Sequence, residues 1–365
     1  MLFFLIALVF VCLWRVKFAS FHEGYIDKDQ TTSIKGIFAI IIIFSHVLGY
    51  VSLTNYFFDT WFKQIIAIIG QLMVTMFFFY SGFGVAKQFQ KNVDYRKDFL
   101  RTRILKTLVH FDIAVLCFAI LALILQREYS WKWYLLSFTG WVAIGNSNWF
   151  VFVTLALYTL TLIGFFISTK FFKKNRLIAF AIIISIFSVA LFVVLYFLKE
   201  IYWYDTLLCY SVGVWYAVLK HKVDVFLKTH KVLSHIVTIA TVLVFILCRL
   251  ILRRILPGFI ADSLTAIVFC LALVFITTKI KMDNPILRWL GKYSFLIYIL
   301  QRIPMIIFAE IGLNIYPHLF FVVVFVLTLG LSYVMNILYE KIDSKFFAKK
   351  IKKYTEENKY VEEGK

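Results

Sequence analysis

The sequence predicts an all-α, polytopic membrane protein with about eleven transmembrane helices. Of its 365 residues, 62% are hydrophobic and only 16% are charged, whereas soluble domains average about 45–50% apolar and about 25% charged residues. Long apolar runs, such as 37–44 and 180–198, are unbroken and lack the alternation, over about 10 residues, of a membrane β-barrel strand. Because lipid offers no hydrogen-bond partners to exposed backbone groups, these runs are predicted to be helices.

Each predicted span is a mostly apolar segment close to the length that crosses a bilayer. The first is short and has the length of a signal peptide. No basic residue precedes its apolar run and no small-residue cleavage site follows it, so we expect a helix there. The eleven segments are residues 1–14, 33–53, 64–86, 104–126, 149–169, 177–198, 203–219, 232–252, 260–278, 286–310 and 317–339.

The distribution of Lys and Arg supports this segmentation and predicts its orientation. Of the 39 basic residues, 29 fall in one alternate set of loops and in the tail, and seven fall in the other set. Cytoplasmic loops are the more basic ones, so we expect a plasma (inner) membrane protein with its N-terminus outside and its C-terminus inside. The net charge of +19 thus marks orientation and attraction to anionic lipid. No nucleic-acid motif accompanies it.

The predicted organisation is one membrane domain with short additions. Residues 1–24 form an extra N-terminal helix and a linker, residues 25–340 form the membrane domain, and residues 341–365 form a charged cytoplasmic tail. The cysteines lie in apolar spans without the spacing of metal ligands, so they are interpreted as small core residues and no metal is expected. They are Cys12, Cys117, Cys209, Cys248 and Cys270.

Ionisable side chains inside predicted spans are the first candidates for function, because burying them in lipid is costly. Lys35 and His46 are eleven residues apart on one helix. This spacing is three turns plus about 20°, so both lie on one face, about 16 Å apart along the axis. Lys35 is expected at the cytoplasmic mouth and His46 in the outer half of the bilayer. A histidine there can exchange a proton near neutral pH; the alternative is a packing contact between helices.

Arg302 is predicted to lie about as deep as His46. A buried guanidinium requires an anion, a carbonyl or water. Two interpretations of Arg302 are therefore open. It forms an internal ion pair, with Asp112 or with Glu310 at the outer end, or it binds the substrate. Asp112 is also a candidate for orienting His46, and His110 is a further ionisable group in the same span as Asp112.

Segment 87–106 is the densest basic segment outside the tail. Clustered guanidinium groups bind phosphates well, although anchoring at the cytoplasmic surface explains such loops too. Just before it, Gly82 and Gly84 permit close approach by a helix or by a thin ligand arm, and glycine spacing alone favours a helix. Several basic residues share one face of the segment, and these are among Arg96, Lys97, Arg101, Arg103 and Lys106.

Two features stand out on the predicted outer side. Loop 127–148 is rich in aromatic residues, which suits an interfacial belt or stacking on sugar rings. Arg249, Arg253 and Arg254 place three positive charges where few are expected. Snorkelling at a helix end explains them, and recognition of an acidic glycan or lipid phosphate is the alternative.

Taken together, these motifs resemble those of the membrane-bound acyltransferase family 3. The family pattern opens with a basic residue, ten intervening positions and a histidine, and it continues with Phe-Phe-x-x-Ser-Gly-Phe and an arginine-rich stretch. A Trp-Phe pair with a later Tyr follows, and then Gly-Lys-x-Ser-x-x-x-Tyr. The matching positions, in order between about residues 25 and 340, are Lys35 with His46, residues 77–83, residues 99–106, residues 149–150 with Tyr158, and residues 291–300.

The resemblance implies a ten-helix acyltransferase core that takes acyl-CoA from the cytoplasm and acylates an acceptor, often a cell-envelope sugar. Three departures matter. Lys35 replaces the usual arginine and lacks bidentate geometry toward phosphate. Gln301 stands where a histidine is common and cannot act as an acid or base. The chain also ends without the extracytoplasmic hydrolase-like domain of some members, so we expect transfer within the membrane domain or on a partner.

The mechanistic hypothesis is O-acylation, in the first instance O-acetylation, of a saccharide or lipid-linked saccharide hydroxyl. His46 is the expected general base or transient acyl carrier, and Arg302 or Gln301 is expected to stabilise the oxyanion. Alternatives are a transporter or flippase of lipid-linked sugars, or a non-catalytic subunit of an envelope-synthesis complex. The residues expected to bind the CoA donor are Lys35, Ser81, Gly82, Arg96, Arg101 and Arg103.

Overall fold

The described chain is almost entirely helical, as the sequence predicts. The computed structural model describes residues 1–54 and 57–347, and it is 81% helical. Two short strands, β1 (Val16–Phe18) and β2 (Ile280–Met282), form the one sheet of this part of the chain. The all-α, polytopic fold class is therefore confirmed. Residues 348–365 of the predicted charged tail lie outside the described residues.

Within the described residues, eight helical segments are long and apolar enough to cross a membrane. A ninth candidate is a pair, α14 (Pro285–Lys292) followed by 294–310, whose two parts are bent by 55°. The eight are α2 (Lys28–Val47); α3 (Phe57–Ile69) with α4 (Leu72–Lys91); α5 (Tyr95–Phe99) with the π-helix η1 (Leu100–Leu105) and α6 (Lys106–Ile124); α8 (Trp149–Phe171); α9 (Arg176–Leu198); α11 (Lys231–Leu247) with the π-helix η3 (Cys248–Leu252) and α12 (Arg253–Ile255); α13 (Gly258–Lys279); and α17 (Pro317–Ile342) with the π-helix η5 (Asp343–Phe347).

Two of the eleven predicted spans are neither among these eight segments nor part of the bent pair. Helix α1 (Leu2–Leu13) has 12 residues, so it is only about 18 Å long and too short to cross a hydrocarbon core of about 30 Å alone. Helix α10 (Leu208–Thr229) is long enough but carries Lys220, Lys222 and Asp224 in its second half. The remaining short elements are α7 (Trp131–Phe138), η2 (Ile201–Trp203), α15 (Ser294–Leu300), α16 (Arg302–Glu310) and η4 (Leu313–Ile315).

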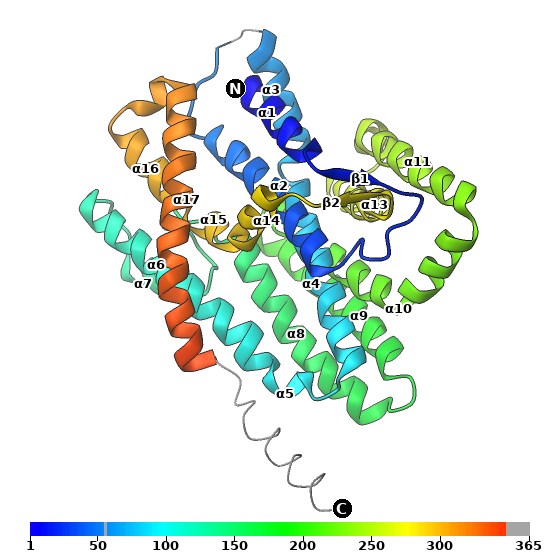
Figure 1. The fold of residues 1–365 in the computed structure, drawn as a ribbon. Coiled ribbons are helices and arrows are strands. Elements are labelled where there is room, and N and C mark those ends of the chain that lie inside the picture. The colour runs from blue at the N-terminus through cyan, green and yellow to red at the C-terminus, as the bar shows by residue number, and fades with distance from the viewer. Residues whose placement is uncertain (55–56, 348–365) are drawn as a thin grey trace, which may run out of the picture.

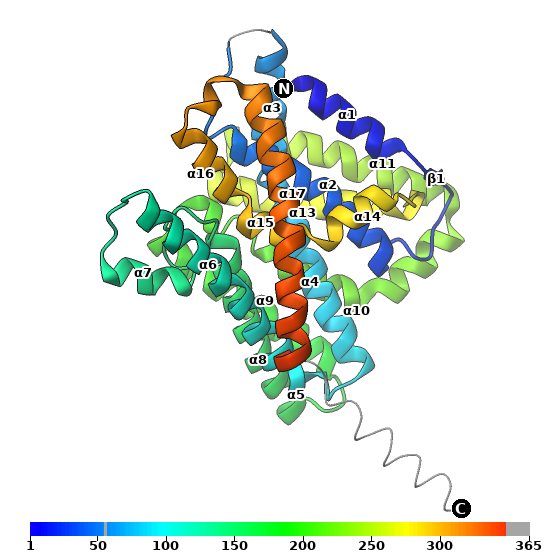
Figure 2. The ribbon, with the colours of Figure 1, turned by 60° about the vertical axis from the view of Figure 1, so that its left-hand side comes forward.

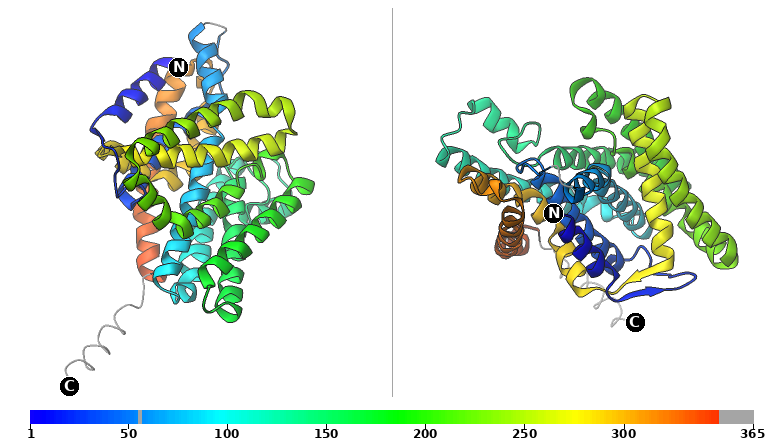
Figure 3. Two further views of the ribbon diagram at one scale, coloured as in Figure 1. Left: turned by 90° about the vertical axis from the view of Figure 1, so that its right-hand side faces the viewer. Right: turned by 90° about the horizontal axis from the view of Figure 1, so that it is seen from above.

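The helices form an irregular bundle. Helix α1 lies near one end of the bundle, and α17 runs from that end to the opposite one (Figure 1). Helix α17 passes the bent pair formed by α14 and α15, while α6 and α7 project to one side (Figure 2). Helices α11 and α13 cross the direction of α17 at a steep angle at the periphery (Figure 3). Most apolar side chains of α11 are exposed, as expected of a helix that faces lipid.

Four glycines bring two pairs of helices into very close contact. A Cβ on Gly36 of α2 would lie 2.1 Å from the carbonyl oxygen of Leu287 on α14, and one on Gly291 would lie 1.7 Å from that of Thr32. The same arrangement joins α4 to α10, where Gly82 and Gly213 are the small residues. Small residues are what membrane helices need for such backbone approach. The contact made by Gly82 is therefore with α10.

The small sheet fixes the N-terminal linker beside the bundle. Strands β1 and β2 are antiparallel, with Val16 opposite Met282. Further along, the hydroxyl of Tyr25 donates to Asp224 of α10 at 2.7 Å and lies 2.7 Å from the Tyr216 hydroxyl. Tyr25 is buried. These contacts hold the linker against α10 just before α2 begins, where it borders the cavity described next.

Candidate active site

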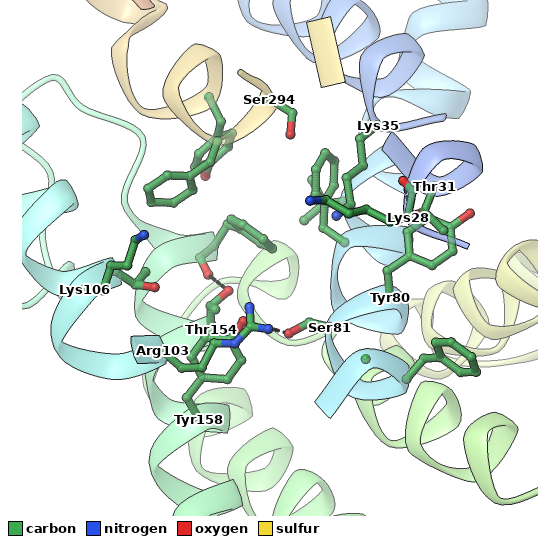
Figure 4. A pocket seen from close by; sticks show the side chains of 18 of the residues that line it. Lys28, Thr31, Lys35, Tyr80, Ser81, Arg103, Lys106, Thr154, Tyr158 and Ser294 are labelled. Atoms are coloured by element: carbon green, nitrogen blue, oxygen red, sulfur yellow. Dashed lines mark hydrogen bonds between the residues drawn. The ribbon is translucent and has the colours of Figure 1, made fainter. Parts of the chain in front are cut away.

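A cavity of about 710 Å³ opens between α2, α4, α6, α8 and α15. Its size is that of a small-molecule or cofactor pocket. Figure 4 shows polar and basic side chains from these helices around it. Many of its lining residues come from the segments that carry the predicted motifs, which lie far apart in the sequence.

Five basic side chains line the cavity, and four of them lie near the ends of α2, α4 and α6 that the sequence predicts to be cytoplasmic. Lys35 lies one to two turns inside α2, its Nζ 6.0 Å from the centre of the Tyr80 ring. Arg103 donates from Nε to the Tyr95 hydroxyl at 3.0 Å. Lys35 and Arg103 both line this cavity, so the two cations face one space. Such a cluster is suited to an anion of several charges. The five basic residues are Lys28, Lys35, Lys87, Arg103 and Lys106.

The middle of the cavity is lined by hydroxyl groups. The Ser81 Oγ lies 2.8 Å from the Tyr158 hydroxyl, joining α4 to α8. The hydroxyl of Tyr80 is buried and makes no hydrogen bond with any described residue. Ser294 on α15 lines the same space. Ser81, predicted to bind the donor, thus lies in the cavity wall beyond the basic end.

The inner end of the cavity is aromatic and stops next to His46. Phe77, Phe150 and Tyr298 line it, and the rings of Phe150 and Tyr298 lie 5.3 Å apart. Tyr298 also contacts His46, with ring centres 6.4 Å apart at an angle of 66°. His46 itself is absent from the cavity lining. Tyr298 therefore links the aromatic end of the cavity to the histidine.

Tyr298, which lines the cavity and contacts His46, is a candidate site residue that the sequence reasoning missed. It belongs to the late motif, but no role followed from the motif itself. A usable signal was its spacing of four residues from Arg302, which places two helical side chains on neighbouring positions of one face.

Arg302 lies at the start of α16, within electrostatic range of the His46 ring. Its Nε has no hydrogen-bond partner in the described chain. Neither of the ion pairs left open by the sequence occurs among the described residues. Glu310 bonds to Arg127, and Asp112 Oδ1 is buried without a partner there. His46 and Arg302 are each only partly buried.

Three residues predicted to bind the donor lie outside the cavity lining. Arg101 donates from Nε to the carbonyl of Phe346 at 3.0 Å, Arg96 donates to Thr169 at 2.8 Å, and Gly82 contacts α10. Their roles toward a donor stay predictions. His110 is held at 2.9 Å from Asp343, and the described residues contain no cluster of His, Cys, Asp or Glu that would hold a metal ion.

Two features of the predicted outer side make internal contacts. Arg253 donates to both oxygens of Asp262, at 2.7 and 2.6 Å, and Arg249 lies 3.9 Å from the same carboxylate. Lys199 lies over the rings of Trp141 and Trp203, at 3.6 and 4.3 Å from their centres. Part of the arginine trio and of the aromatic loop therefore stabilises the fold.

The fold and this site define a class of protein: a multi-pass helical membrane protein with a basic cavity that ends beside a histidine. A family model described as an acyltransferase domain matches residues 29–337. The chain therefore belongs to this family, acyltransferase family 3, as its motifs predict. No curated protein and no solved structure matches the chain.

Proposed function

We propose that this membrane acyltransferase moves an acyl group, in the first instance acetyl, from cytoplasmic acyl-CoA to a hydroxyl of a cell-envelope saccharide or lipid-linked saccharide. The observation that carries the proposal is the cavity, which is basic at one end and is lined at the other by Tyr298, a ring in contact with His46. The proposed orientation follows the basic residues, with the C-terminus and the basic end of the cavity at the cytoplasmic side.

The cavity matches the chemical parts of acyl-CoA in order. Lys35 and Arg103 would hold phosphates, because several charge-assisted hydrogen bonds to one polyanion are strong. The uncharged pantetheine arm would pass Ser81 and Tyr80 toward Tyr298. Lys35 and His46 are about 16 Å apart along α2, at 1.5 Å per residue. An extended arm covers that length and brings the thioester to the aromatic end.

The reaction would then proceed at the aromatic end of the cavity. The oxygen of the acceptor hydroxyl attacks the carbonyl carbon of the thioester, and His46 takes the proton of that hydroxyl. The Nε–H of Arg302 is free to donate to the oxyanion that forms. When the intermediate collapses, the C–S bond breaks and the imidazolium returns the proton to the thiolate. The new C–O bond makes the ester, and CoA leaves through the basic end.

Binding of CoA to the purified protein tests the donor site. Replacing Arg103 by alanine should weaken CoA binding at least tenfold, because a hydrogen bond to a charged group contributes about 1.5–3 kcal/mol and about 1.4 kcal/mol is a factor of ten. Isothermal titration in detergent measures both affinities.

Arg101→Ala is the matched comparison for the donor site, because the sequence predicts a donor role for Arg101 as well. Arg101 is two residues away but bonds to the Phe346 carbonyl outside the cavity, so its removal should change CoA affinity less than threefold. Equal losses in the two variants, or no CoA binding by the unaltered protein, would contradict the assignment. A transporter or a structural subunit would not need a CoA site at this position.

A further inference from the structure

The loop before α8 contains two buried polar side chains with unused hydrogen-bonding groups. Asn146 and Ser147 are 1% and 4% exposed. The Oδ1 of Asn146 accepts from the backbone N–H of Ile144 at 2.9 Å. Its Nδ2 and the Oγ of Ser147 have no partner among the described residues. A buried polar group without a partner costs about 1–3 kcal/mol, so a bound molecule that pairs with both would recover that free energy.

This loop lies at the end of α8 that is away from the donor entrance. Helix α8 runs from Trp149 to Phe171, and α6 runs from Lys106 to Ile124. The loop between them therefore lies at the end of the bundle opposite Lys106 and the other basic side chains of the cavity mouth. Phe150, just after the loop, packs against Tyr298.

The loop also packs on the face of α16 that carries Arg302. A Cβ on Gly145 would lie 3.0 Å from Ile306. Gly145 has φ of +102°, a conformation that glycine adopts readily. Ile306 is four residues after Arg302, so the two side chains occupy one face of the helix. Asn146 and Ser147 directly follow Gly145.

The break between α15 and α16 adds a hydrogen-bond acceptor to this region. Gln301 is fully buried and donates from Nε2 to the Tyr298 carbonyl at 3.3 Å. Its Oε1 is left without a partner within the described residues, as is the Nε of Arg302. A carbonyl oxygen accepts and does not donate. The free atom of Gln301 is therefore suited to a hydroxyl donor, whereas Arg302 is suited to an oxyanion.

The free groups of Asn146, Ser147 and Gln301 differ in their hydrogen-bonding roles. Asn146 Nδ2 donates, Gln301 Oε1 accepts, and Ser147 Oγ does either. A hydroxyl group both donates and accepts, so neighbouring hydroxyls on one ring satisfy such a mixed set. Trp149 and Tyr202, whose ring centres are 6.0 Å apart, are partly exposed next to this loop. They offer apolar faces to the C–H side of a polyol.

We propose that Asn146, Ser147 and Gln301 form an acceptor subsite, which takes a polyhydroxylated ring and presents one hydroxyl to His46. This inference rests on the proposed acyl transfer. It assigns the acceptor to the side of Tyr298 opposite the CoA arm, so that donor and acceptor approach His46 from opposite ends of the bundle.

The test uses membranes from cells that make the full chain, supplied with acetyl-CoA labelled in the acetyl group. Label in saccharide material and label released as free acetate are measured separately, at several donor concentrations. Ser147→Ala and Asn146→Asp should each lower label in saccharide at least tenfold. Asn146→Asp keeps the oxygen that accepts from Ile144, so the loop retains its internal hydrogen bond. The KM for acetyl-CoA and the release of acetate should stay within twofold of their original values.

The matched control is Ser188→Ala on α9, which removes an equally buried hydroxyl without a partner among the described residues and should leave both measurements unchanged. Unchanged labelling in Ser147→Ala and Asn146→Asp would overturn the subsite. A raised KM for acetyl-CoA, or label recovered only in material without carbohydrate, would also overturn it. Failure of the proposed function looks different: the unaltered protein would then transfer no label at all.

Discussion

Replacing His46 by alanine is expected to lower acyl transfer at least 100-fold. A positioned general base contributes about 10²–10⁴ in rate, and His46 is the histidine that the structure places next to both Tyr298 and Arg302. Binding of CoA should be retained, because the phosphates are assigned to Lys35 and Arg103 at the other end of the cavity. Transfer of labelled acetyl in isolated membranes, normalised to the amount of inserted protein, measures the effect.

His235→Ala supplies the control for this experiment. His235 is exposed on the peripheral helix α11, so its replacement should leave transfer unchanged. Retained transfer in His46→Ala, in protein that is inserted normally, would remove His46 from the mechanism while leaving the family assignment intact. A loss of CoA binding in the same variant would mean that His46 supports the donor site instead of the chemistry.

Gly291→Ala is expected to have the largest effect on the fold itself. The added Cβ would lie 1.7 Å from the carbonyl oxygen of Thr32 and 3.0 Å from its side chain. A backbone carbonyl within a helix cannot rotate away, so α14 and α2 would have to separate. Overpacking typically costs about 1–3 kcal/mol, and a backbone clash of this size should cost at least that much. Lys35 of the cavity wall lies on α2, and Ser294 begins α15 directly after α14, so CoA binding should fall as well.

Gly330→Ala is the matched control for helix packing. Gly330 also lies in a long helix, α17, but a Cβ there would meet nothing within 4 Å. Alanine favours a helix over glycine by about 1 kcal/mol, so this variant should unfold at the same temperature or slightly above. The thermal unfolding midpoint in detergent distinguishes the two. Equal midpoints for Gly291→Ala and the unaltered protein would contradict the close approach of α2 and α14.

Three residues that the sequence predicted to bind the donor, Lys35, Ser81 and Arg103, line one cavity. Turn geometry placed Lys35 on the same helix face as His46. Ser81 was predicted from the family motif, and Arg103 from the clustering of basic residues and the arginine-rich motif. The sequence also predicted that all of the spans would be helices, since the apolar runs are long and the backbone in lipid has no other hydrogen-bond partner.

The features that sequence missed depend on contacts between distant segments. Arg101 and Arg103 look equivalent in the arginine-rich stretch, but one bonds to the Phe346 carbonyl and the other faces the cavity. Nothing local to residues 99–106 distinguishes them. Likewise, Arg253 is neutralised by Asp262 on the next helix. The contact of Tyr298, a cavity residue, with His46 arises only when α15 packs against α2.

The sidedness of donor use tests the central claim most directly. Acetyl-CoA labelled in the acetyl group does not cross a sealed bilayer, so it is added outside inside-out and right-side-out vesicles prepared from the same cells. The account predicts transfer of label in inside-out vesicles, where the basic end of the cavity faces the added donor. Right-side-out vesicles should transfer label only after they are made permeable. Transfer in intact right-side-out vesicles that equals or exceeds transfer in inside-out vesicles would contradict the account.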